Sequence, residues 1–325
     1  MKISVICTVK DEEKSIAELL VSLRAQTRPP DEIIIADGGS TDGTAEIIQE
    51  FAAAGMPIEV LALPGSNIAQ GRNAAIRAAS GQVIASTDAG VRLESCWLEE
   101  LVRPWENGRN LDEAMPGVVS GFFLADPQGI FETAMGATVL PSLGEISPES
   151  FLPSSRSVAF TKAAWETVGG YPEWLDYCED LVFDLGLRRA GVRFEFVPQA
   201  IAHFRPRSSL RSFFLQYFRY ARGDGKADLW RKRHLIRYTA YILGPLALAV
   251  GFWYKVLWLL VLAGLLVYLW RPYRRLWPMM RGWPLAHRLP AIILVPMIRV
   301  TGDLAKMIGY PVGLFWRLRG GARHR

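Results

Sequence analysis

Cysteine is scarce in this sequence, and so are the patterns that usually go with it. The three cysteines among 325 residues (Cys7, Cys96 and Cys178) are odd in number, far apart and form no Cys-x-x-Cys pair. This argues against both a disulfide framework and a structural zinc site. A signal peptide is also lacking, because Met1 leads directly into a strand pattern and then a charged helix. We therefore expect the N-terminal part to be cytosolic.

Glycine is missing from the turn where several nucleotide-binding folds require it. The first predicted strand ends in Thr8-Val-Lys-Asp-Glu12. A dinucleotide dehydrogenase needs glycines here so that the backbone can approach a pyrophosphate. No G-x-x-x-x-G-K-[ST] sequence occurs either, so a P-loop is excluded.

Acidic residues are nearly absent from the last third of the chain. Residues 1–204 contain 15 Lys/Arg and 29 Asp/Glu, a net charge of −14, whereas residues 205–325 contain 22 and 3, a net charge of +19. A basic tail can bind nucleic acid or an anionic membrane surface. Because the basic residues here flank apolar runs, we expect a membrane and no nucleic acid.

Two apolar stretches follow the acidic part. Residues 238–270 carry one charge, Lys255, and 33 residues suit a hairpin of two short spans better than one span of about 20 residues. Basic flanks on both sides predict that both ends face the cytosol, which makes a multi-pass protein of the cell membrane. The stretch 289–316 contains Arg299, Asp303 and Lys306, so an amphipathic interfacial or re-entrant helix is favoured over a span.

The first 90 residues alternate between strand and helix patterns. Short β-branched runs end at Cys7, Ala36, Ala62 and Ser86, with helical patterns at about 12–25, 43–54 and 67–79 between them. This alternation predicts an α/β fold whose parallel sheet is covered on both faces. Further helices are expected at 161–169 and 180–190. A Pro-, Ser- and Gly-rich loop is expected at 126–157, and we expect one side of a binding site there.

Four short motifs follow one another along the chain. They are Asp37-Gly-Gly-Ser-Thr-Asp-Gly-Thr44, Thr87-Asp88-Ala-Gly90, Glu179-Asp180 and Gln216-Tyr-Phe-Arg219-Tyr220. Their order resembles the membrane-attached family 2 glycosyltransferases. The resemblance implies a GT-A fold, which is a Rossmann-like nucleotide-diphospho-sugar transferase domain, at 1–230. A membrane-associated helical region would follow at 231–325.

The resemblance implies a donor pocket at the ends of the first strands. Thr8 and Glu12 match the family's first turn and would line the base and ribose pocket, although acids at a helix start also suit the helix dipole. Asp37 would accept a hydrogen bond from the base or ribose, and Ser40, Thr41 or Asp42 is expected to cap the next helix. Arg72 would point toward the donor, unless it is an ordinary exposed helical arginine.

Asp88 is the expected metal ligand. By resemblance it would hold Mg²⁺ or Mn²⁺ on the diphosphate, and one or two carboxylates plus phosphate oxygens can suffice for such hard cations. The family's second acid is replaced by Gly90. His203, at the end of the last predicted strand, is a second candidate ligand, with a merely buried or surface histidine as the alternative.

The remaining motifs carry the expected chemistry. Asp180 would be the general base that takes the proton of an acceptor hydroxyl, with Glu179 as a supporting acid. Gln216 and Arg219 resemble a Q-x-x-R-W motif, with Tyr220 in the Trp position. Arg219 would stabilise the leaving diphosphate, and an amphipathic interfacial helix is the simpler alternative.

These expectations add up to an inverting glycosyltransferase at a membrane. Its donor would be a UDP- or GDP-linked sugar, its acceptor a hydroxyl of a membrane lipid or lipid-linked glycan, and homo-oligomers are possible. One rival is a catalytically degenerate binding or scaffold protein with the same fold, which Gly90 keeps open. Another is a sugar-phosphate nucleotidyltransferase, but its Gly-rich basic loop after the first strand is absent here.

Overall fold

The computed structural model describes residues 1–106 and 115–320, and the chain divides into two compact units. Unit 1 comprises Met1–Asp126 and Leu143–Arg205, and unit 2 comprises Pro127–Ser142 and Pro206–Arg325. The helix at Leu210–Ala227 therefore falls in unit 2, whereas the sequence suggested a domain boundary near residue 230.

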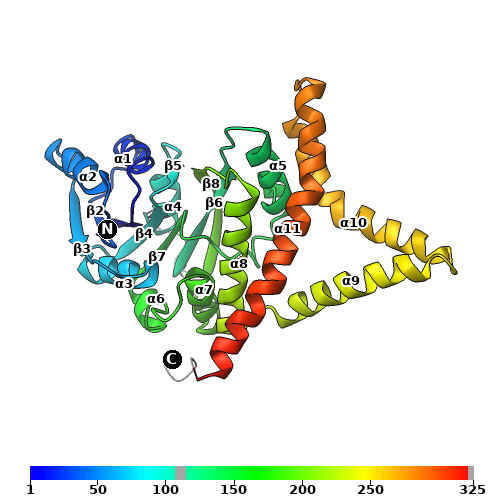
Figure 1. Ribbon diagram of the computed structural model, residues 1–325. Coiled ribbons are helices and arrows are strands. Elements are labelled where there is room, and N and C mark those ends of the chain that lie inside the picture. Colours follow the sequence, from blue (N-terminus) through cyan, green and yellow to red (C-terminus); the bar gives the residue numbers. More distant parts are fainter. Residues whose placement is uncertain (107–114, 321–325) are drawn as a thin grey trace. The chain divides into compact units, whose positions relative to one another are not determined.

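Unit 1 is built on one eight-stranded sheet in the order β3-β2-β1-β4-β7-β6-β8-β5 (Figure 1). The strands are β1 Ile3–Val9, β2 Glu32–Asp37, β3 Ile58–Ala62, β4 Val83–Asp88, β5 Val91–Leu93, β6 Val118–Ala125, β7 Val158–Thr161 and β8 Phe194–Phe204. The first four are parallel, as predicted. The other half is mixed, since β7 runs antiparallel to both β4 and β6, and β5 antiparallel to β8.

Helices cover both faces of this sheet, as the alternating pattern predicted. They are α1 Ile16–Arg24, α2 Thr44–Ala53, α3 Ile68–Ala78, α4 Trp97–Glu106, α6 Lys162–Thr167 and α7 Glu179–Arg189, with a short 3₁₀ turn at Leu143–Glu145. Successive side chains of a strand point to opposite faces. Thus Val5 and Cys7 of β1 join the core under α1 and α4, whereas Ile6 joins the core under α3 and α7.

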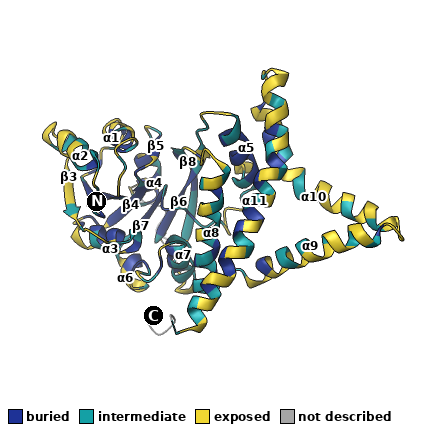
Figure 2. Cartoon of the chain, viewed as in Figure 1, coloured by how far each residue is buried: buried dark blue, intermediate teal, exposed yellow. Residues whose placement is uncertain are grey.

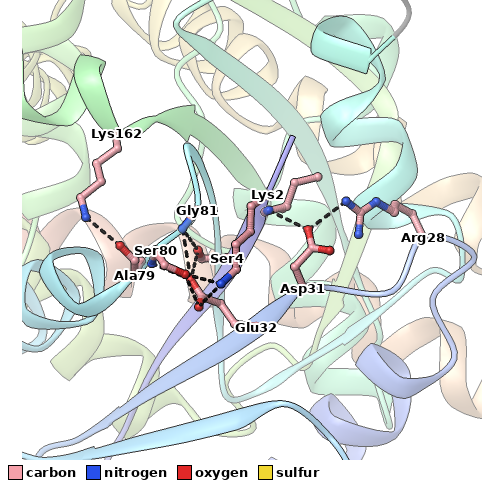
Figure 3. A network of polar contacts seen from close by, with 10 residues as sticks. Lys2, Ser4, Arg28, Asp31, Glu32, Ala79, Ser80, Gly81 and Lys162 are labelled. Carbon is pink, nitrogen blue, oxygen red and sulfur yellow. Dashed lines mark hydrogen bonds and ion pairs between the residues drawn. The ribbon is translucent and has the colours of Figure 1, made fainter.

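The N-terminal ends of β1 and β2 are held by a polar network (Figure 3). The carboxylate of Glu32 accepts hydrogen bonds from the backbone N–H of Ser80 at 2.7 Å, from the Ser80 hydroxyl at 2.6 Å and from the Ser4 hydroxyl. Burial acts to raise the pKa of Glu32, but the bonds from Ser4 and Ser80 outweigh it and lower the pKa to about 2. This network joins the strands at their amino ends, opposite the carboxyl ends where the site is predicted.

Unit 2 consists of helices: α5 Ile130–Val139, α8 Leu210–Ala227, α9 Arg231–Val250, α10 Val256–Met279 and α11 Leu285–Leu318. The loop predicted at 126–157 was wrong in part, because it contains α5. Apolar side chains of α5, among them Ala134 and Met135, are buried with Phe213 and Ile298. Tertiary burial, which the composition of the segment does not reveal, thus favours a helix there.

Helices α8 and α11 pack with their backbones in contact. A Cβ atom added at Gly313 would lie 2.0 Å from the carbonyl oxygen of Arg222, and one at Gly309 would lie 2.2 Å from that of Phe218. Only glycine fits such an approach, which is typical of helix pairs joined through small residues. This packing explains why α8 belongs with the C-terminal helices.

Two helices, α9 and α10, occupy the segment where the hairpin is predicted, and most of their large apolar side chains are exposed (Figure 2). Among the described helices, α10 is long and apolar enough to cross a membrane, whereas α9 and α11 do not qualify. The sequence predicted two spans, so the second remains a prediction. The exposed apolar surface of the hairpin makes membrane association plausible.

Candidate active site

The predicted site residues of unit 1 meet at the carboxyl ends of β1, β2 and β4. In the β-ladder Val9 lies opposite Asp37, and Thr8 lies opposite Asp88. With neighbouring strands about 4.8 Å apart, the two aspartates flank β1 at roughly 10 Å from each other. Open α/β sheets bind ligands at the carboxyl ends of their strands.

Asp37 is a fixed and nearly buried carboxylate. Its Oδ1 accepts hydrogen bonds from the Gly39 N–H at 3.1 Å, the Ser40 N–H at 2.9 Å and the Ser40 hydroxyl at 2.8 Å. All three donors belong to the turn that follows β2. The turn therefore orients the carboxylate through one oxygen.

The turns after β1 and β2 are joined to each other. The carboxylate of Asp11, at φ 54°, accepts a hydrogen bond from the Thr41 N–H at 2.8 Å, and the Thr44 hydroxyl accepts one from the Glu12 N–H at 2.8 Å. The predicted cap of α2 was wrong in position. The N-cap is Gly43, and Asp42 just before it accepts the Thr44 N–H at 3.1 Å.

Arg72 lies at the centre of the site. It is 2% exposed, and its guanidinium donates from Nη2 to Asp88 at 2.9 Å and from Nη1 to Glu179 at 2.6 Å. Burial acts to lower the pKa of Arg72, but the charges of Asp88 and Glu179 outweigh it and raise the pKa. The alternative of an exposed helical arginine is therefore wrong.

Two neighbours of Arg72 explain its position. A Cβ atom added at Gly71 would lie 3.0 Å from Cγ2 of Thr8, so the glycine lets α3 approach β1 closely. Asn73 donates to the carbonyl of Tyr171 at 2.8 Å and accepts from its N–H at 2.9 Å. This pair of bonds fastens the segment before α7 to α3, a function that the sequence did not reveal.

Glu179 and Asp180 begin α7 in different surroundings. Glu179 is buried, and burial followed by the charge of Asp180 raises its pKa to about 7, while Arg72 acts to lower it. Asp180 is half-buried and accepts a hydrogen bond from the Leu181 N–H at 2.8 Å. Within the described residues, no lysine or arginine forms an ion pair with Asp180. The pair thus combines an arginine-bound acid with an accessible one.

Two further residues of the site escaped the sequence analysis. Nε of Arg156 lies 3.5 Å from Oδ2 of Asp88, so a second arginine faces this carboxylate, but no motif surrounds it. Asp184 follows Asp180 by one turn of α7 and is fully buried. Burial, with the charge of Asp180, raises its pKa well above the usual range.

The side chain of His203, a predicted metal ligand, contacts Glu94 and not Asp88. Its Nε2 lies 2.5 Å from Oε1 of Glu94, and in the sheet it pairs with Arg92 of β5. Across the described ranges, no group of three or more His, Cys, Asp or Glu side chains could hold a metal ion. A Cβ atom at Gly90 would meet nothing within 4 Å, so there is space beside Asp88.

Gln216 and Arg219 belong to unit 2. Both lie on α8, where Nε2 of Gln216 donates to the hydroxyl of Tyr220 at 2.8 Å. The tyrosine that replaces the family's tryptophan thus holds the glutamine side chain.

Sequence comparisons identify the family of unit 1. Residues 4–121, which contain nearly all of β1, all of β2 to β5 and the first half of β6, match the model of glycosyl transferase family 2. This part of the chain is thus a family 2 glycosyltransferase domain. The match to this domain and the glycosyltransferase relatives below support a transferase enzyme.

Individual relatives agree with this family. The succinoglycan biosynthesis protein ExoA of Rhizobium meliloti is 26% identical over 233 residues, which are 66% of this chain and 67% of that protein. The glycosyltransferase AglE of Haloferax volcanii is 35% identical over 102 residues, which cover only 33% of its length.

Solved structures agree on the fold of this family 2 glycosyltransferase. The mannosyltransferase PcManGT from Pyrobaculum calidifontis, solved in complex with GDP-Man and Mn²⁺, has a TM-score of 0.58 at 18% identity. The match covers 97% of this chain and 87% of that one. The predicted GT-A fold is thereby confirmed.

Proposed function

We propose that this enzyme transfers a sugar from a nucleotide-sugar to a hydroxyl group at a membrane, with inversion at the anomeric carbon. The observation that carries the proposal is the ion-pair network at the strand ends. Arg72 joins Asp88 to Glu179, and Asp180, the next residue, is accessible. Donor-binding and proton-accepting carboxylates are thus linked through one buried cation.

The donor nucleotide would bind over the ends of β1 and β2. Asp37 is held through Oδ1, which leaves Oδ2 for a hydroxyl of the ribose or an N–H of the base. Thr8 and Glu12 flank this position on the first strand and its turn. Acids at strand ends bind ribose hydroxyls in other nucleotide folds as well. These residues support both uridine and guanosine donors equally.

Asp88 is the proposed ligand of a divalent cation, which would take the place of Arg156 at Oδ2. This carboxylate is 28% exposed, lies beside the open space at Gly90, and could hold Mg²⁺ or Mn²⁺ together with diphosphate oxygens and water. The cation would supply positive charge to the leaving diphosphate. His203 remains a candidate ligand only if it leaves Glu94.

Asp180 would act on the acceptor. As the acceptor oxygen bonds to the anomeric carbon, the bond from that carbon to the diphosphate oxygen breaks, and the carboxylate of Asp180 takes the hydroxyl proton. Ionised Glu179 would favour this proton uptake by its negative charge. Arg72 would hold Glu179 and Asp88 in register with each other.

The acceptor would be a membrane lipid or a lipid-linked glycan. The exposed apolar surface of the α9–α10 hairpin and the basic residues before it support an enzyme held at the membrane. Arg219 would add positive charge for the leaving diphosphate, as its motif suggests.

A donor screen tests this function. Full-length protein in detergent is mixed with UDP- or GDP-linked sugars, a lipid extract and Mn²⁺, and the released nucleoside diphosphate is measured. We expect release with one donor class. Asp88→Ala should lower metal-dependent donor binding, whereas the matched variant Glu50→Ala, which changes an exposed acid near the end of α2, should not. No release with any donor would contradict the proposal.

A further inference from the structure

A cavity of about 520 Å³ lies between α9 and α11, within unit 2. Its lining combines cationic, aromatic and apolar side chains. They are Arg231, Lys232, His234, Leu235, Tyr238, Tyr310, Leu314 and Arg317. None of these residues belongs to the predicted catalytic set.

Cationic side chains gather at one end of the cavity, whose own surface is almost entirely apolar. Arg231 Nη2 lies 2.5 Å and Arg317 Nη1 2.6 Å from the carboxylate of Asp228, so one acid is shared by two arginines. The hydrogen bond from Arg231 lowers the pKa of Asp228 to about 2, which keeps the acid ionised. No described carboxylate forms an ion pair with Lys232. Asp224, which contacts His234 of the lining at 3.2 Å, is a second acid, so three cations against two anions leave an excess of one positive charge.

The other end of the cavity is lined by apolar side chains. Helix periodicity explains the order in which cationic, leucine and tyrosine side chains follow one another along the cavity. Arg231, Leu235 and Tyr238 share one face of α9, and Arg317, Leu314 and Tyr310 share one face of α11, because residues four and seven apart line up. The sequence order is reversed on α11. Both helices therefore present a cation, then a leucine, then a tyrosine.

The cavity also lies where the predicted membrane segment begins. Leu235 and Ile236 are 66% and 68% exposed, and the apolar stretch of the hairpin begins at Tyr238. One helical turn, about 5.4 Å, thus separates the cationic end from exposed apolar surface. In a lipid bilayer this is the step from headgroup phosphates to hydrocarbon.

We propose that this cavity binds one anionic phospholipid of the surrounding membrane. The phosphate would lie among Arg231, Lys232 and Arg317, and an acyl chain would follow Leu235 and Leu314. Charge complementarity favours an anionic lipid over a zwitterionic one. The leucines favour a lipid over free phosphate, which would leave the apolar end unused. Such a bound lipid would fix α9 against α11 at the membrane surface.

Lipid binding to the full-length protein tests the site. The protein in non-ionic detergent is titrated with phosphatidylglycerol that carries a fluorescent acyl chain, and unlabelled lipids and inorganic phosphate serve as competitors. Since a basic residue near a lipid surface is worth about 5-fold in affinity, Arg231→Gln with Arg317→Gln should weaken binding roughly 25-fold. Lys232→Gln alone should weaken it roughly 5-fold and leaves the bonds to Asp228 intact.

The matched control is Arg233→Gln with Arg319→Gln. These arginines lie two residues away on α9 and just past α11, and they stack on Trp230 and Phe315 rather than line the cavity. We expect the control to retain affinity within about 2-fold, against the roughly 5-fold assigned to each lining charge. Equal losses in both pairs would mean unspecific surface charge and would overturn the proposal.

The competitors decide between ligands. Unlabelled phosphatidylglycerol should displace the probe, and phosphatidylcholine or inorganic phosphate at the same concentration should not. Displacement by inorganic phosphate would assign a free-phosphate site, and displacement by a polyprenyl phosphate at far lower concentration would assign an acceptor site. Either result would overturn the phospholipid assignment.

Discussion

Replacing Arg72 by methionine removes the cation that joins two carboxylates of the site. Methionine keeps much of the volume in this fully buried position but carries no charge. Asp88 is 28% exposed and still faces Arg156. The loss of its ion pair with Arg72 should therefore cost no more than the loss of a surface ion pair, about 1 kcal/mol. Glu179 is 8% exposed, and breaking a buried pair by removing one partner typically costs about 3–5 kcal/mol. Because Glu179 avoids part of this cost by staying protonated in the variant, we expect a total loss of about 3 kcal/mol, dominated by Glu179.

The destabilisation by Arg72→Met should depend on pH. The pKa of Glu179 is about 7, so between pH 6 and 8 the wild-type carboxyl ionises next to Arg72. In the variant it stays neutral, because Arg72 no longer opposes the effect of burial. The stabilisation that ionisation gives relative to the neutral form grows by about 1 kcal/mol over these two pH units. The variant should therefore lose about 1 kcal/mol more at pH 8 than at pH 6.

Thermal unfolding in detergent, followed by tryptophan fluorescence, measures this effect. For a unit of this size, 1 kcal/mol corresponds to roughly 2–4 °C, so we expect Arg72→Met to lower Tm by about 10 °C. The control is Arg77→Met on the same helix, whose ion pair to Glu173 is 3.5 Å long and exposed. A loss in Arg72→Met no larger than in Arg77→Met, or the same loss at both pH values, would refute the reasoning.

Three further predictions concern pH, stability and membrane attachment. Ionised Glu179 should strengthen Asp180 as a base, so kcat/KM should rise with pH through about 7 and lose this inflection in Glu179→Gln; an unchanged inflection would assign it to another group. Glu32→Gln should destabilise the fold by about 1.5–3 kcal/mol at pH 7 in urea unfolding. This loss should shrink below the unfolded pKa near 4.5 and vanish toward pH 2, because the folded pKa is lowered, and a constant loss would contradict it. Replacing residues 242–266 by a short Gly-Ser linker should let carbonate extract the protein from membranes, whereas full-length protein that carbonate extracts would exclude a spanning hairpin.

Local sequence patterns predicted the first half of unit 1 well. The β-branched runs and the turn residues after them determine β1 to β4, because strand and turn preferences depend on a few neighbouring residues. The motif positions also follow from this, since Asp37 and Asp88 end strands that flank β1. The alternation of strands with helices was enough to predict that the strands of this half are parallel.

Contacts between distant segments could not be predicted. The antiparallel pairing of β7 with β4 joins residues more than 70 positions apart, and α5 becomes helical where residues far along the chain bury it. Arg156 reaches Asp88 from a loop without any motif. Arg72 was identified by its motif, but only burial reveals that it joins Asp88 to Glu179. The contacts of such residues depend on which segments the tertiary structure brings together, and a local sequence pattern does not contain this information.

The most direct test of the proposed reaction is the turnover of Asp180→Asn. Full-length wild-type and variant protein are compared with saturating donor, lipid acceptor and Mn²⁺, and both nucleoside diphosphate and product mass are measured. We expect the wild-type protein to add a sugar mass to the acceptor. The variant should bind donor normally but react about 10²–10⁴-fold more slowly, because asparagine cannot take the hydroxyl proton. Turnover by Asp180→Asn near the wild-type rate would contradict the proposed mechanism.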